Sequence, residues 1–63
     1  MKVERYLLEY IREHRISARR MEQDTGINLQ HFVEEGKELR ADEFIELCLY
    51  LGITPDEVSD QIL

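Results

Sequence analysis

The sequence predicts a small all-α domain made of five short helices. Apolar residues recur at helical spacing in every segment, and no segment alternates apolar and polar residues as a strand would. The single proline and the three glycines fall between the apolar-periodic segments, where they end or begin helices. With 63 residues, of which 43% are hydrophobic, we expect residues 1–63 to form one domain with an apolar core.

The first helix is expected at roughly residues 2–14. Its apolar side chains recur at the spacing i, i+3, i+4, i+7, i+8, which places them on one helix face. They are Val3, Tyr6, Leu7, Tyr10 and Ile11.

The second and third helices are each predicted from a cap and a terminating glycine. Ser17 is positioned to cap a helix over residues 18–24, and Gly26 tolerates the left-handed conformation that ends it. Asn28 caps the third helix, residues 29–35, which ends at Gly36. Its apolar side is made of Leu29, Phe32 and Val33.

The fourth helix, residues 41–51, has the widest apolar stripe. Ile45 and Leu49 widen a stripe formed by Phe44, Leu47, Cys48 and Leu51. A helix that is apolar on most sides is usually the central one, so we expect it at the centre of the core. Gly52 ends it.

The fifth helix, about residues 55–62, begins with a capping box. Thr54 is the cap, Pro55 takes the first helical position, and Glu57 stands at the third. We expect Val58, Ile62 and Leu63 to point inward.

The net charge of −6 comes entirely from the last third of the chain. Residues 1–40 are neutral overall, whereas residues 41–63 hold six acids and no base. Helix dipoles and capping account for most of these acids, which also suit a surface that repels DNA or binds a basic partner protein. Four of the eight basic residues gather within residues 12–20 and could meet phosphates: Arg12, Arg15, Arg19 and Arg20.

Several classes of protein are disfavoured. No apolar run approaches the roughly 20 residues that cross a membrane, and the lone Cys48 suits a reducing compartment, so we expect a cytoplasmic protein. Cys48 fits a core position better than a nucleophile, and His14 and His31 lack metal-ligand spacing. We expect neither catalytic residues nor a metal nor a cofactor, and hence no enzyme.

Residues 7–60 resemble the Cro/phage-repressor-like (XRE) helix-turn-helix family. The resemblance rests on I-S before the second helix, the T-G-I-N turn, the G-K-E-L loop, and the ending A-D-E-F…L-G-I-T-P-D-E-V. It implies a compact, five-helix, lambda-repressor-like domain with the helix-turn-helix at about 17–35. It also implies a transcriptional regulator that binds double-stranded DNA as a homodimer.

The resemblance implies two groups of DNA-contacting residues. The phosphate candidates are Arg12, Lys37, and the pair Arg19 and Arg20, which follow Ala18 where the family usually has a glutamine. The base-reading candidates lie on the third helix from Asn28 onward. Leu29 would touch a thymine methyl, Gln30 would read adenine, and Glu34 would accept from cytosine.

An alternative keeps the same fold without DNA binding. Glu22 stands where the family has a small residue, and the third helix is about two residues shorter than usual. Acids at 34, 35 and 38 lie where phosphates would approach. These features favour a protein-interaction or dimerisation module, with Leu29 and Val33 as exposed contacts. DNA binding would weaken steeply with salt, whereas a hydrophobic interface would hardly respond.

Overall fold

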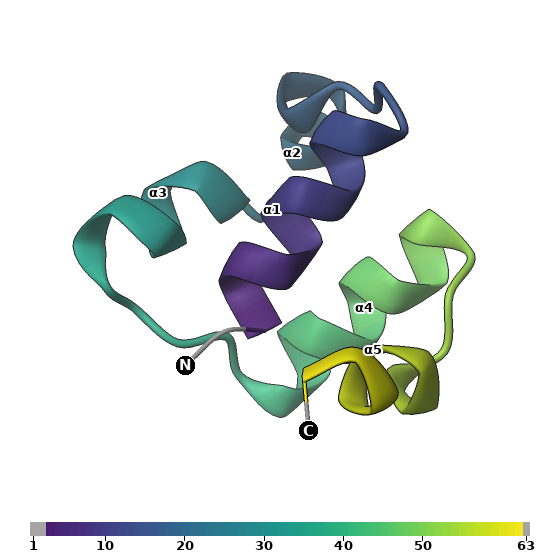
Figure 1. Ribbon diagram of the computed structural model, residues 1–63. Coiled ribbons are helices and arrows are strands. Elements are labelled where there is room, and N and C mark those ends of the chain that lie inside the picture. The colour runs from purple at the N-terminus through teal and green to yellow at the C-terminus, as the bar shows by residue number, and fades with distance from the viewer. Residues whose placement is uncertain (1–2, 63) are drawn as a thin grey trace.

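The computed structural model describes residues 3–62, with the side chains of residues 61 and 62 excepted, and these residues form five α-helices without a strand. The helices, drawn in Figure 1, are α1 (Val3–Glu13), α2 (Ala18–Thr25), α3 (Leu29–Glu35), α4 (Ala41–Leu51) and α5 (Pro55–Ile62). The all-α, five-helix prediction is therefore confirmed, and each predicted helix agrees with the observed one to within a residue or two. The inward placement expected for Ile62 and Leu63 falls outside the described side chains.

The predicted caps set where the helices begin. The Ser17 hydroxyl accepts a hydrogen bond from the Arg20 amide at 3.1 Å, and the Asn28 side-chain oxygen accepts from the His31 amide at 3.0 Å. At the start of α5, Thr54 Oγ1 accepts from the Glu57 amide at 3.2 Å, and the Glu57 carboxylate accepts from the Thr54 amide at 2.9 Å. Each bond satisfies a backbone amide that has no partner within its own helix.

The centre of the fold is α1. It packs against α3 and α5, and Figure 1 shows it between α3 on one side and α4 and α5 on the other. Leu7, Leu8 and Ile11 of α1 are buried; Leu8 lies outside the stripe predicted for this helix. The other buried apolar residues are Met21, Ile27, Leu29, Leu47, Cys48 and Val58.

The expectation that the fourth helix is central is wrong. α4 packs against α2 and α5 through one side, where Leu47 and Cys48 are buried. The side chains that were expected to widen the stripe lie outside the core, with Ile45 49% and Leu49 77% exposed. The physical reason is that α2 and α5 pack against the side of α4 that carries Leu47 and Cys48, whereas the opposite side, which carries Ile45 and Leu49, is left exposed to solvent.

One charged residue is part of the interior. Glu4, in the first turn of α1, is 7% exposed, and its carboxylate accepts a hydrogen bond from the Leu39 amide at 2.9 Å. Leu39 lies in the connection between α3 and α4, so this bond fastens that connection to the start of α1.

Candidate nucleic-acid interface

The turn between α2 and α3 is fixed by local bonds. Gly26 ends α2 in the left-handed conformation with φ of +78°, which glycine adopts without the clash that other residues suffer. Thr25 Oγ1 donates to the Met21 carbonyl at 2.7 Å and accepts from the Ile27 amide at 3.2 Å. Ile27 is itself buried, so the turn is anchored in the core. α2 and α3 consequently hold a defined relative position, and they also pack against each other.

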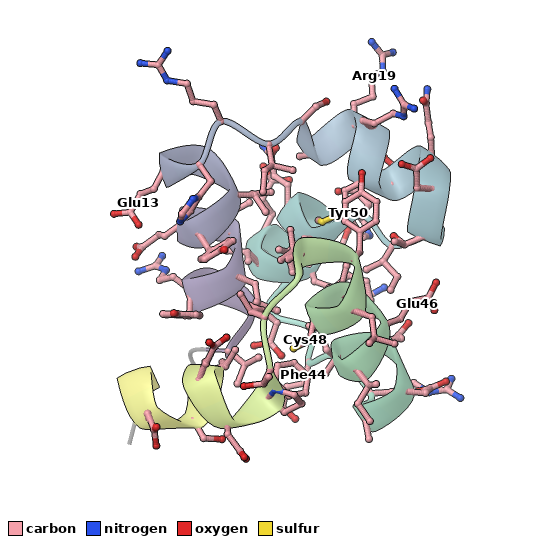
Figure 2. All side chains as sticks on the ribbon, turned by 90° about the vertical axis from the view of Figure 1, so that its right-hand side faces the viewer. Glu13, Arg19, Phe44, Glu46, Cys48 and Tyr50 are labelled. Atoms are coloured by element: carbon pink, nitrogen blue, oxygen red, sulfur yellow. The ribbon has the colours of Figure 1, made fainter. Side chains whose placement is uncertain are left out.

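Three predicted phosphate contacts are exposed cations near the start of α2 and the end of α1. Arg19 extends from α2 away from the body of the molecule, as Figure 2 shows. Arg20 pairs with Asp24 one turn later, with 3.4 Å between Nε and the carboxylate oxygen. Among the described residues, no ion pair engages Arg12 or Arg19. These two guanidinium groups are therefore available to an anion, whereas Arg20 already has an acidic partner.

Lys37 lies apart from this group, in the connection after α3. Its ammonium is 3.5 Å from a Glu35 carboxylate oxygen, so an internal acid partly neutralises it. With Arg5, Phe32 and Val33, Lys37 lines a surface hollow between α1 and α3.

Arg5 is the cation that the sequence reasoning missed. It lines the hollow beside Lys37 and also a second hollow between the same helices, which contains Arg12. Arg5 and Arg12 are seven residues apart, a spacing that returns to the same helix face after two turns. This spacing is visible in the sequence, and it would have added Arg5 to the phosphate candidates.

Two of the base-reading candidates lie beside Arg12. Gln30 and Glu34 line the second hollow, and the Gln30 amide nitrogen donates to a Glu34 carboxylate oxygen at 3.2 Å. Both residues are exposed. Asn28 is exposed as well, but its side-chain oxygen is occupied by capping α3.

The predicted role of Leu29 is wrong. Leu29 is 1% exposed and belongs to the core, so it can touch neither a thymine methyl nor a second protein. The residue opens α3 on the stripe that continues through Phe32 and Val33, and this stripe faces the core. The base-reading candidates are therefore reduced to Asn28, Gln30 and Glu34. The alternative protein-interaction module likewise loses Leu29 as an apolar contact.

The exposed surface of α3 is acidic. Besides Glu34, Glu35 is exposed, and its carboxylate lies 3.3 Å from the His31 ring nitrogen Nε2. Glu22 of α2 is exposed, so its side chain does not have to be accommodated in the contact between α2 and α3. α3 therefore contributes carboxylates and amides to this region, whereas its cations come from α1, α2 and the connection after α3. The other histidine, His14, is not part of α3, and its ring stacks on the Tyr10 ring with 4.0 Å between ring centroids.

Two titratable groups of α4 have a raised pKa. Burial raises the pKa of the Cys48 thiol, and the nearby Glu57 carboxylate adds to the effect, which disfavours the nucleophilic thiolate. The Tyr50 hydroxyl donates to the Asp24 carboxylate at 2.9 Å, and this hydrogen bond raises the pKa of Tyr50. The bond ties α4 to α2.

Two kinds of feature are absent from residues 3–62. These residues contain no cluster of three or more side chains able to hold a metal ion. None of the described helices is both long enough and apolar enough to cross a membrane.

The chain matches no family model, and neither a curated protein nor a solved structure is significantly similar to it.

Proposed function

We propose that this chain is a small DNA-binding transcriptional regulator with a helix-turn-helix of the Cro/repressor type. The observation that supports it best is the pair α2 and α3, joined by the anchored Gly26 turn, with exposed Arg19 and Arg20 in the first turn of α2. A helix-turn-helix uses such an arrangement to place its second helix in the major groove while the first crosses the phosphate backbone.

In this proposal the cations position the protein and α3 reads the bases. Arg19 and Arg20 bind phosphates beside the groove, and Arg12 and Lys37 bind phosphates on either side of α3. Gln30 leaves Glu34 to form two hydrogen bonds to an adenine, and the freed Glu34 carboxylate accepts from a cytosine amino group. Asn28 stays on the cap of α3 and contributes its amide nitrogen.

The proposal includes a homodimer. One copy offers few base contacts, because Leu29 is buried in the core. Two copies related by a two-fold axis double the contacts on a pseudo-palindromic site, with half-sites about 34 Å apart.

The test is DNA affinity measured at two salt concentrations. We would follow the fluorescence anisotropy of a labelled mixed-sequence duplex at about 50 and 200 mM NaCl. Four neutralised phosphates predict that affinity falls about 150-fold between these concentrations, because binding releases condensed counterions. The double variant Arg19→Ala/Arg20→Ala keeps two contacts, so its affinity should fall only about 12-fold over the same range.

Arg40→Ala is the matched control. Arg40 is exposed at the start of α4, where it lies 3.9 Å from Asp42, and it belongs to none of the phosphate candidates. We expect this variant to keep the wild-type salt slope. If each charge removed lowered the salt slope equally in Arg40→Ala and in the double variant, the assignment of Arg19 and Arg20 would be refuted.

A second candidate function is a protein-interaction module on the same fold. The acidic surface of α3 favours it, because Glu34 and Glu35 repel phosphates that approach this helix. No DNA binding at high micromolar protein and 50 mM salt would favour this second function over the first.

A further inference from the structure

The side of α4 that faces away from the core carries two exposed aliphatic side chains. Four residues at the spacing i, i+3, i+4, i+7 share this side, which we call the α4 outer face. They are Asp42, Ile45, Glu46 and Leu49. Leu49 is 77% and Ile45 49% exposed, and Tyr50 is the remaining large hydrophobic residue that is exposed in the described chain.

Neither the fold nor the proposed function uses the α4 outer face. The core contacts of α4 go through its opposite side, where Leu47 and Cys48 are buried. Figure 2 shows Glu46 pointing away from the rest of the molecule, with no helix beyond it. The DNA-contacting candidates lie on α1, α2, α3 and the connection after α3. Exposed aliphatic side chains that adjoin one another, unlike ones scattered singly, offer an apolar contact for a partner.

Charge indicates what kind of partner fits. Asp42 and Glu46 are exposed beside the two aliphatic residues, and residues 41–63 contain no lysine or arginine. The nearest cation along the chain, Arg40, already lies 3.9 Å from Asp42. A second copy docked on this face by two-fold symmetry would place Asp42 and Glu46 of both chains in one interface, to which α4 brings no lysine or arginine, and the repulsion among these like charges opposes association. A partner with basic residues would pair with them instead.

We propose that the α4 outer face docks a basic amphipathic helix of a partner protein. Two aliphatic residues of that helix, four positions apart, cover Ile45 and Leu49. Its lysine or arginine side chains on either side face Asp42 and Glu46. This is helix-on-helix recognition through anchors spaced by one helical turn. The inference does not depend on DNA binding, because the two surfaces are on different elements.

The probe is a synthetic 14-residue amphipathic helix of leucine and lysine with leucines at i, i+4 spacing. Titrated into the isotope-labelled chain, it should shift the backbone amide resonances of residues 42–50 most, with micromolar affinity. Leu49→Ser should weaken binding about tenfold, because it removes the most exposed apolar contact. Since Leu49 lies outside the core, circular dichroism should show that this variant stays folded.

Two comparisons separate this docking from general charge attraction. Glu46→Gln should weaken binding, whereas Glu13→Gln should not; both glutamates are exposed, and Figure 2 shows them on opposite sides of the molecule. A peptide of identical composition but scrambled order should bind weakly and shift no defined region.

Three results would overturn the proposal. Equal effects of the two glutamine variants, or resonance shifts spread over all acidic regions, would show that only net charge attracts the peptide. Sedimentation that reveals a dimer of the wild-type chain and a monomer of Leu49→Ser would assign the α4 outer face to a second copy.

Discussion

The buried carboxylate of Glu4 should contribute a large share of the stability of this small fold. Its oxygen accepts a 2.9 Å hydrogen bond from the Leu39 amide, and the residue is 7% exposed. Glu4→Ala leaves that amide without its charged acceptor. A hydrogen bond to a charged group contributes about 1.5–3 kcal/mol. We therefore expect the free energy of unfolding to fall by about 2 kcal/mol.

That loss is large relative to the total. A single core in a chain of this size supplies no more than about 3–5 kcal/mol. For so short a domain, about 2 kcal/mol lowers the melting temperature by roughly 8–16 °C. Glu4→Gln keeps a neutral acceptor oxygen, and because charge roughly doubles the strength of such a bond, it should cost about half as much.

Urea denaturation followed by circular dichroism measures this directly. Glu9→Ala is the matched control, since Glu9 is an exposed glutamate in the same helix and its replacement should change stability by no more than about 0.5 kcal/mol. The reasoning is refuted if Glu4→Ala and Glu9→Ala unfold at the same urea concentration. It is also refuted if Glu4→Gln is less stable than Glu4→Ala.

Two further predictions concern the groups with perturbed pKa. The Cys48 thiol should react with a disulfide reagent at pH 8 about a hundredfold or more slowly than in the urea-unfolded chain, because burial both raises its pKa and blocks access; equal rates would contradict its core position. The pKa of Tyr50 is raised by its hydrogen bond to Asp24, so this bond stabilises the fold fully below the unfolded pKa of about 10 and is lost as pH rises through the folded value. Absorbance titration at 295 nm, with Tyr50→Phe to isolate the signal, should show a lower Tyr50 midpoint in Asp24→Asn; an unchanged midpoint would argue against the bond.

Local patterns in the sequence were sufficient to predict the helices. Helical spacing, the caps at Ser17 and Asn28, and the glycines after α2 and α3 act within one or two turns of the chain. Such interactions do not depend on what lies across the core. The five helices could therefore be located before any packing was known.

The faces of these helices that are buried could not be predicted in the same way. Leu29 and Leu49 both belong to apolar stripes, yet the first is 1% exposed and the second 77%. Periodicity shows that a helix has an apolar side, but the neighbours available to cover it depend on how all five helices pack.

Some features of the candidate site could likewise be predicted from the sequence, whereas others depend on how the helices pack. The sequence by itself determined the arginine-rich segment, the spacing of the second and third helices and the acidic last third. Only the tertiary structure placed Arg5 beside Lys37, and buried Glu4 against a connection 35 residues further along the chain. The reason is that both relationships join residues far apart in sequence. Their proximity depends on α1 lying between α3 and the later helices, not on any local preference of the chain.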